Sequence, residues 1–265
     1  PSVAFSELGN TRYLSVYYED AAGDINLYSL DLNSGLGNDS EFLNRSLDID
    51  RLVISKNSQI AAYTLKDIPR FTVLDFDSDE SNVVEPKTES FSENVSGFPV
   101  EQIDSIKFDP TNREIAFDFQ ICDSFSDGKC FWAIGFYDIE TDELLYPFPK
   151  QLSSVSVGYP SFANQNSRYV VFDLVFNNGL ETSQSVIFDR ESKAQLSESL
   201  SYIALSHDSS QSSHYSQPSF TGNDSGLVFT YKNADDTNNM AIIELDNYKS
   251  ASPLDLEFLF TGLNV

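Results

Sequence analysis

Basic residues are scarce in this chain. Its 265 residues include 16 Lys and Arg against 41 Asp and Glu, for a formal net charge of −25. Such a surface repels nucleic acid and anionic membranes, so we expect neither as a partner. The acids are spread along the chain, which favours a solvated surface; a surface for a cation or a basic partner is the functional alternative.

Helical patterns and long apolar runs are also lacking. The chain has one Met, few heptad-like patterns and no stretch of ~18 apolar residues that would predict a membrane span. Its hydrophobic fraction of 40%, with 21 Phe and 13 Tyr, is too high for a disordered chain and favours strands. No signal peptide is visible and the chain starts at Pro1, so we expect a mature form or a piece cut from a longer protein.

The sequence contains only two cysteines, Cys122 and Cys130, in ICDSFSDGKCFW. Seven residues separate them and include Asp127-Gly128 as a turn, which predicts a disulfide that closes a hairpin loop. Such a bridge would place the protein in an oxidising compartment, a bacterial periplasm or the cell exterior. Two free thiols and a metal pair are the alternatives, but zinc would need two more ligands.

Common catalytic motifs are missing too. The sequence has no Gly-x-Ser-x-Gly elbow, no His-Glu-x-x-His pair and no Gly-rich phosphate loop. The sequence therefore leans away from an enzyme without deciding the question.

What the chain does contain is a repeat. In Pro218–Asp246, PSF is followed by a polar turn, the apolar run LVFTY, a loop, and MAIIEL before an Asp. Five units share this order. Their first strands carry Phe5, Ile54, Phe108, Phe162 and Phe220, and their third strands end before Asp31, Asp75, Asp138, Asp189 and Asp246. We interpret these five Asp residues as turn caps, with a ring of metal ligands as the functional alternative.

A four-stranded sheet cannot bury its faces alone, and radial packing of such sheets solves the problem. We therefore predict an all-β fold, a single β-propeller domain of four-stranded antiparallel blades over 1–265. The repeat units are roughly 1–48, 49–102, 103–156, 157–212 and 213–265. Five blades are favoured over six or part of a longer array. The irregular stretch 77–102 is expected to hold one edge strand near Asn82–Glu85 and a long excursion.

The pattern of Pro-Ser-Phe, polar turn, apolar-aromatic strand, loop and Asp-terminated strand resembles the β-propeller repeat of the TolB-like family, a relative of WD repeats. The second unit lacks the Pro-Ser start, and no unit has the full Ser-Pro-Asp-Gly turn. The resemblance implies a non-catalytic, extracytoplasmic bacterial scaffold that binds a protein or peptide partner in the cell envelope. The family also includes the propeller parts of enzymes. We expect a monomer; one domain of a longer surface protein is a further alternative.

Long loops on one face of such a scaffold are the expected binding region. The candidate residues are His207, Asp208 and His214 in one Ser-rich loop, and Tyr18, Asp20, Asp235 and Asp236 at two aromatic-acidic loop mouths. The alternative applies if the histidines lie beside acidic residues of the propeller's central channel. The chain would then be a propeller enzyme or carbohydrate-binding module acting on a glycan, with a metal or His site.

No cofactor is expected apart from a divalent cation such as calcium. The alternating acids of Asp75–Glu80 look like the start of a calcium loop. They lack the Gly and the final Glu that an EF-hand requires, so a solvated acidic turn is the preferred interpretation.

Overall fold

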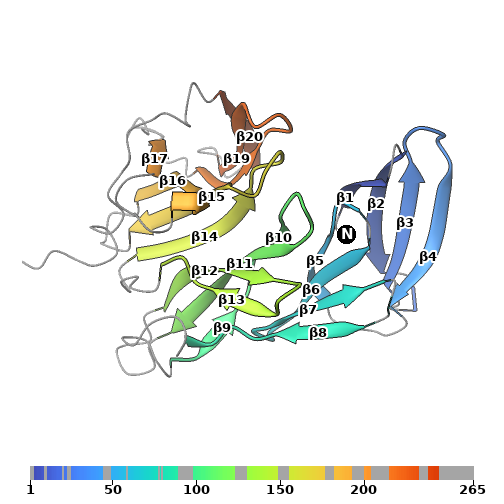
Figure 1. The fold of residues 1–265 in the computed structure, drawn as a ribbon, viewed down its shortest axis with the longest axis horizontal. Helices are drawn as coiled ribbons and strands as arrows, with labels where there is room; N and C mark the ends of the chain where they lie inside the picture. Colours follow the sequence, from blue (N-terminus) through green and yellow to red (C-terminus); the bar gives the residue numbers. More distant parts are fainter. Residues whose placement is uncertain are drawn as a thin grey trace, which may run out of the picture. The chain divides into compact units, whose positions relative to one another are not determined.

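The computed structural model describes residues 3–8, 11–19, 21–22, 25–43, 49–57, 59–76, 78, 80–88, 98–122, 130–148, 155–176, 182–192, 200–203, 215–232 and 238–244. These residues form antiparallel sheets (Figure 1), which confirms the all-β prediction. Within these ranges, no helix has both the length and the apolar character needed to cross a membrane. Contacts divide the chain into two compact units, Pro1–Glu85 and Pro86–Val265, and each is described by itself.

The first unit contains two four-stranded meanders. Sheet 1 consists of β1 (Val3–Leu8), β2 (Thr11–Glu19), β3 (Ile25–Asp31) and β4 (Gly37–Leu43), paired in chain order. Sheet 2 consists of β5 (Ile49–Ile54), β6 (Ile60–Leu65), β7 (Phe71–Asp75) and β8 (Ser81–Val84), also in chain order. The strand β8 confirms the predicted edge strand. The apolar core of sheet 2 is formed by Leu52, Ile54 and Ala61, with Ile49, Tyr63 and Phe76 packed against them.

The second unit contains three further sheets. Sheet 3 pairs β10 (Ile106–Phe108), β11 (Glu114–Cys122), β12 (Cys130–Asp138) and β13 (Glu143–Leu145), and β9 (Val100–Gln102) adds to β11. Sheet 4 pairs β14 (Val155–Phe162), β15 (Tyr169–Phe176), β16 (Thr182–Asp189) and β17 (Leu200–Ile203); the short 3₁₀ helix η2 (Arg190–Ser192) follows β16. Sheet 5 pairs β18 (Tyr215–Phe220), β19 (Gly226–Lys232) and β20 (Asn238–Glu244).

The end of the predicted excursion forms the strand β9. This strand pairs with β11 of sheet 3 and does not extend sheet 2. The predicted last strand, 256–260, lies outside the described residues. Four-stranded antiparallel meanders of this kind are the blades of a β-propeller.

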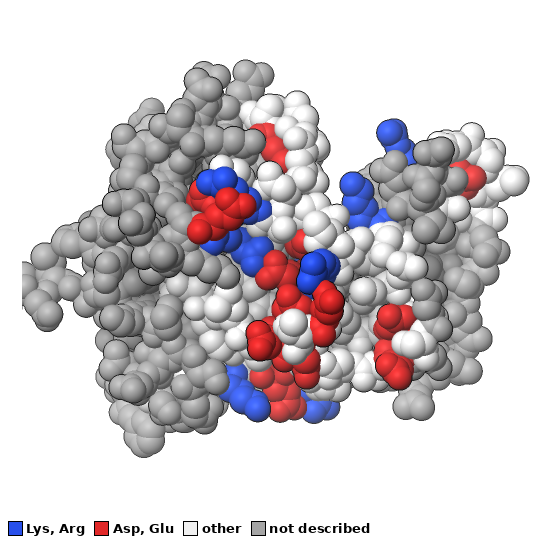
Figure 2. Space-filling view, viewed as in Figure 1, with Lys and Arg blue, Asp and Glu red and all other residues white. Residues whose placement is uncertain are grey.

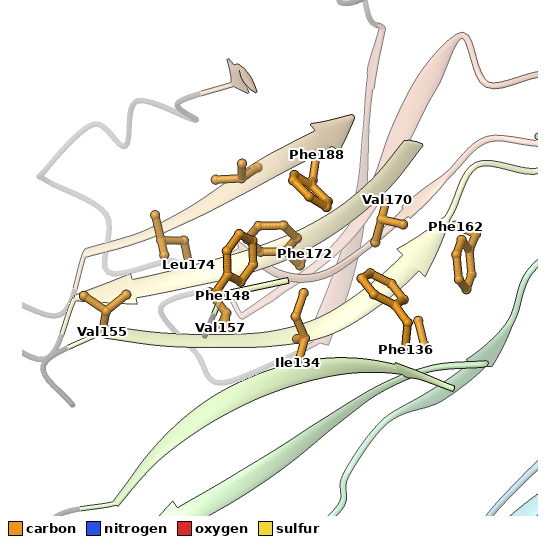
Figure 3. Packing of buried hydrophobic residues seen from close by; sticks show 12 residues of the cluster. Ile134, Phe136, Phe148, Val155, Val157, Phe162, Val170, Phe172, Leu174 and Phe188 are labelled. Carbon is orange, nitrogen blue, oxygen red and sulfur yellow. The ribbon is translucent and has the colours of Figure 1, made fainter. Parts of the chain in front are cut away.

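Sheets 3, 4 and 5 pack face to face through apolar side chains. Between sheets 3 and 4, Ile134 and Phe136 of β12 lie against Val157, Phe172 and other residues of sheet 4 (Figure 3). Between sheets 4 and 5, the core consists of Ala163, Tyr169, Val171, Ile187, Phe220, Leu227 and Phe229. Both faces of sheet 4 are thus buried, which explains why β15 reads as an uninterrupted apolar run around one Asp.

Positions in different sheets can be matched through the strand register. Ile187 of β16 faces Val171, and Ile242 of β20 faces Val228 in the same way. Ile187 is 1% exposed because sheet 5 covers it, whereas Ile242 is 69% exposed and Met240 on the same face is 74% exposed. Ile187 and Ile242 are both isoleucines at equivalent register positions, and they differ in whether a neighbouring sheet covers them.

The turn between the first and second strands is built alike in three sheets. A side-chain oxygen at its first position accepts the backbone N–H of the residue five positions later. The pairs are Ser55 with Ile60 at 2.9 Å, Asp109 with Glu114 at 2.9 Å, and Thr221 with Gly226 at 3.0 Å. The polar turns of the repeat are thus short rigid corners.

The Asp residues that end the third strands cap the following turn, as predicted. Each carboxylate accepts a backbone N–H two or three residues later: Asp31 from Asn33, Asp75 from Ser78, Asp138 from Thr141 and Asp189 from Glu191. The fifth, Asp246, lies outside the described residues. The hydroxyl of Ser34 and the amide of Asn33 hold the pKa of Asp31 below its usual value.

One of these caps carries an ion pair. Arg168 donates from Nε and Nη2 to the two oxygens of Asp189, at 2.8 and 2.6 Å, and Asp189 is 8% exposed. We expect Arg168→Lys to lower the free energy of unfolding by about 1 kcal/mol, because a lysine cannot form the two-pronged bond. Urea unfolding measures this. Arg113→Lys is the control, since its pair with Glu140 is exposed on both sides and should change stability little; equal losses in both variants would contradict the prediction.

The predicted disulfide is present. Cys122 and Cys130 face each other across β11 and β12, with a Cα–Cα distance of 4.1 Å. The described residues contain no free cysteine.

Reduction of this bridge should cost stability. Closing a loop across a sequence separation of 8 removes unfolded-chain entropy worth about 2–3 kcal/mol. Urea unfolding with and without reductant measures the loss. A variant with both cysteines replaced by serine should be insensitive to reductant, and an equal response there would show that the effect does not come from the bridge.

Candidate functional site

Most of the loop residues predicted for binding fall outside the described residues. These are Asp20, His207, Asp208, His214, Asp235 and Asp236. Tyr18 is described: it pairs with Asn26 near the end of β2, and the residue is 37% exposed. The structure therefore does not test whether these residues form one binding site.

The acidic segment after β7 is partly described. The backbone N–H of Asp75 donates to the carbonyl oxygen of Glu80 at 3.0 Å, which closes a tight turn, while Asp77 and Asp79 lie outside the described residues. In the described part of the chain, no three His, Cys, Asp or Glu side chains are grouped so that they could hold a metal ion. Calcium binding by this segment stays the alternative to the predicted solvated acidic turn.

A different set of polar residues is brought together in the second unit, at bulges in two first strands. In β14 the register shifts between Gly158 and Ser161, and in β18 between Ser216 and Ser219. Tyr159 and Gln217 occupy matched bulge positions, each before a proline and each with positive φ, 53° and 56°. Non-glycine residues rarely adopt this conformation, so something must hold it.

Buried carboxylates hold both bulges. Asp118 of β11, 1% exposed, accepts the backbone N–H of Tyr159 at 2.8 Å and that of Ser105 at 2.6 Å. Asp173 of β15, 4% exposed, accepts the backbone N–H of Gln217 at 2.9 Å and the hydroxyl of Ser185 at 2.9 Å. In both cases a carboxylate on the second strand of one sheet fixes the first strand of the next.

Burial changes the acidity of these carboxyl groups. It raises the pKa of Asp118 to about 7 against the opposing effect of the N–H donors from Tyr159 and Ser105. It likewise raises the pKa of Asp173 to about 7, opposed by its bonds with Gln217 and Ser185. Perturbed carboxyl groups often mark functional sites, but these two are engaged by the backbone that they support.

The two bulges lie in neighbouring first strands. The strands β10, β14 and β18 are neighbours, β14 lying against both of the others. The Tyr159 side chain lies within electrostatic reach of Asp104, just before β10, and of Gln217. Burial, followed by the charge of Asp104, raises the pKa of Tyr159 to about 12, so the phenol is neutral at physiological pH. We call Asp104, Tyr159 and Gln217 the polar row.

The polar row is accessible as well as ordered. Asp104 and Tyr159 are half-buried and Gln217 is exposed. The arginines of the second unit with described ion pairs engage acids elsewhere: Arg113 with Glu140, Arg168 with Asp189 and Glu191, and Arg190 with Glu114. Figure 2 shows acidic side chains gathered over sheet 3, in keeping with the net charge of −25. The row can therefore accept hydrogen bonds and positive charge.

Sequence reasoning missed this row, although a signal was present. The second strands IAFDF and YVVFDL each carry one Asp, Asp118 or Asp173, at the same place within an apolar run. A charged residue at a buried strand position needs partners, so its repetition indicates a fixed structural role. No such pattern marks Asp104, because only the bulges bring it to Tyr159.

The comparisons with known proteins bear on the fold alone. No protein-family model matches the chain, and no curated protein matches it. Among solved structures, Kuenenia stuttgartiensis hydrazine synthase gives a TM-score of 0.51 at 9% identity, over 92% of this chain and 70% of that chain. The tricorn protease gives 0.50 at 9% identity, over 95% of this chain and 30% of that chain.

TolB from Acinetobacter baumannii is also similar, with a TM-score of 0.44 at 14% identity, over 92% of this chain and 52% of that chain. This chain thus spans about a third of the tricorn protease chain and about half of the TolB chain. At such identities a likeness carries no activity or partner with it. The β-propeller fold is confirmed, whereas membership of the TolB-like family, the number of blades and the closure of a ring stay predictions.

Proposed function

We propose that this chain is a non-catalytic scaffold that binds a protein or peptide partner outside the cytoplasm. The observation that carries the proposal is the polar row, in which buried carboxylates hold the backbone of Tyr159 and Gln217 and the Gln217 residue is exposed. Binding sites are typically built in this way, with contact residues fixed by a supporting layer. The disulfide favours an oxidising compartment, the periplasm or the exterior of a bacterium.

The finer architecture belongs to the same proposal. The five sheets would be the blades of one five-bladed propeller that acts as a monomer. Sedimentation velocity tests the oligomeric state: one species of 29.7 kDa at all concentrations is expected. A mass that rises with concentration would reject the monomer.

The test of the binding role is capture followed by reconstitution. The oxidised chain is immobilised and exposed to a bacterial envelope extract, with an unrelated propeller of similar negative charge as the control. A protein enriched only on this chain is then purified and titrated against it by calorimetry. Saturable binding with fixed stoichiometry is expected; if no enriched protein binds the purified chain, the scaffold proposal fails.

A propeller enzyme or carbohydrate-binding module acting on a glycan remains the alternative. It depends on His207 and His214, which lie outside the described residues. Hydrolysis of a glycan panel by the purified chain, lost in a variant with both histidines replaced by alanine, would replace the scaffold proposal with this one.

A further inference from the structure

Two buried carboxyl groups join consecutive sheets of the second unit at equivalent places. Asp118 of β11 accepts the backbone N–H of Tyr159 in sheet 4, and Asp173 of β15 accepts that of Gln217 in sheet 5. Each acid stands three residues after the partner of the Phe that ends the first strand of its own sheet. We call Asp118 and Asp173 the junction carboxyls.

The partners of the junction carboxyls are neutral. Asp118 also accepts the backbone N–H groups of Asp104 and Ser105, at 3.2 and 2.6 Å, and Asp173 also accepts the Ser185 hydroxyl, at 2.9 Å. Asp118 is 1% exposed and Asp173 is 4% exposed, and among the described residues neither belongs to an ion pair. A carboxylate buried in this way has lost its water without gaining an opposite charge, so its ionisation costs free energy while the junction is closed.

The charged groups around Asp118 do not offset this cost. From the segments packed against β11, Asp104 acts on Asp118 with a like charge, and Tyr159 is a phenol whose pKa is raised to about 12. Lys107 of β10 lies on the same face of the sheet as Asp118, but it is exposed to water. The other titratable groups of β9 and β12 are Glu101, Tyr137 and Asp138.

The surroundings of Asp173 bring no charge into contact with it either. The strands β14, β16 and β18 pack against β15, and their titratable residues are Tyr159, Asp189 and Tyr215. Asp189 is bound by Arg168. Burial raises the pKa of Asp173, against the opposing effect of its bonds with Gln217 and Ser185. The two junctions are therefore alike in electrostatics as well as in position.

Each junction also holds backbone strain. Tyr159 and Gln217 have positive φ, 53° and 56°, which non-glycine residues adopt only where the surrounding structure holds them. The N–H groups of these same two residues are the ones that the junction carboxyls accept, at 2.8 and 2.9 Å. Loss of this bond would therefore relax a strained residue and hydrate a buried carboxyl group in one step.

We infer that the junction carboxyls form a pH-sensitive latch inside the second unit: when protonated they keep the first strands of sheets 4 and 5 in place, and when ionised they let these strands open. Opening brings water to the carboxylate, whereas closure requires either a proton on it or a buried charge. The latch goes beyond the proposed binding function and does not depend on it.

The direction follows from the two pKa values that each group has. In the closed junction the pKa is raised to about 7, and in water it returns to about 3.8. Between these values the closed state holds a proton that the open state has lost. The equilibrium for opening should therefore rise up to about tenfold for each pH unit in this range.

The experiment is amide hydrogen exchange of the parent chain from about pH 5 to about pH 7, with each rate divided by that of an unprotected amide at the same pH. We expect the protection of the Tyr159 and Gln217 amides to fall by about tenfold or more. The Gly226 amide is the control, because it donates to the hydroxyl of Thr221, which does not titrate in this range. Its protection should fall clearly less.

Variants assign the effect to each group. Asp118→Asn should remove the pH dependence at Tyr159 and leave that at Gln217, and Asp173→Asn should do the reverse. Glu143→Gln removes an exposed carboxylate of β13 and should change neither.

A carbon-13 NMR titration of the parent covers the case in which an asparagine variant does not fold. The carboxyl signals of Asp118 and Asp173 should titrate at a clearly higher pH than that of Asp31, whose pKa is lowered.

Three results would overturn the latch. Junction carboxyls that titrate in the range of Asp31 would show that burial does not hold their protons. Constant protection of the Tyr159 and Gln217 amides would show that ionisation does not open the strands. An equal fall at Gly226 would show that the unit unfolds as a whole and does not open at its junctions.

Discussion

Replacing Ile187 by alanine should lower the free energy of unfolding by about 3–4 kcal/mol, because it removes buried methyl groups and leaves a cavity between sheets 4 and 5. Ile187 is 1% exposed and packs with Val171, Phe220 and Leu227. These neighbours come from three different strands, so the gap cannot close without moving a sheet. Urea unfolding followed by tryptophan or tyrosine fluorescence measures the loss.

Ile242→Ala is the matched control. The residue holds the same register position in sheet 5 but is 69% exposed, so its truncation should cost less than about 1 kcal/mol. The difference between the two variants therefore measures what a covering sheet contributes. An equal loss in both would contradict the prediction and would mean that Ile242 is covered in solution.

The stability of the parent chain should fall relative to an Asp118→Asn variant as the pH rises from about 4 to about 7. Asp118 has its pKa raised from 3.8 to about 7 by burial, so in this range the unfolded chain loses a proton that the folded chain keeps. Stability then decreases with rising pH, because the folded state binds more protons than the unfolded state. A shift of about 3 units corresponds to a relative change of up to about 4 kcal/mol.

The measurement is urea unfolding of both proteins across this pH range. The asparagine also carries a pH-independent penalty, since its amide group cannot accept every N–H that Asp118 accepts, so the change in the difference with pH is the informative quantity. Asp31→Asn is the control. The pKa of Asp31 is lowered, so relative to that variant the parent should gain stability as the pH rises toward neutrality. A difference for Asp118→Asn that stays constant with pH would mean that the carboxyl group titrates normally.

Short-range features of the sequence determined the strands, the turns and the disulfide. Alternating apolar residues, Gly and Asn turns and Asp caps act within a few residues, so a single unit such as Pro218–Asp246 already contains the information. The pairing of Cys122 with Cys130 belongs to the same class, since one hairpin places them opposite each other. Repetition then indicated stacked blades, because a sheet with two apolar faces needs a neighbour on each side.

The candidate site could not be read from the sequence in the same way. Asp118 and Tyr159 are 41 residues apart, and Asp173 and Gln217 are 44 apart. Their contacts exist only because consecutive sheets stack in register and because the first strands bulge at the residue before a proline. Aromatic and acidic loop mouths are visible in a sequence, but the direction of a side chain at a bulge is not.

What the sequence determined by itself is therefore the blade: its strands, its corners and its cross-linked hairpin, all products of local backbone preference and periodic hydrophobicity. What only the tertiary structure decided is the use of its polar residues. Stacking buried Asp118 and Asp173, turned them into supports for a neighbouring strand, and brought Asp104, Tyr159 and Gln217 together at the surface. The physical reason is that burial and long-range hydrogen bonding depend on which sheets meet, and no segment of the chain carries that information alone.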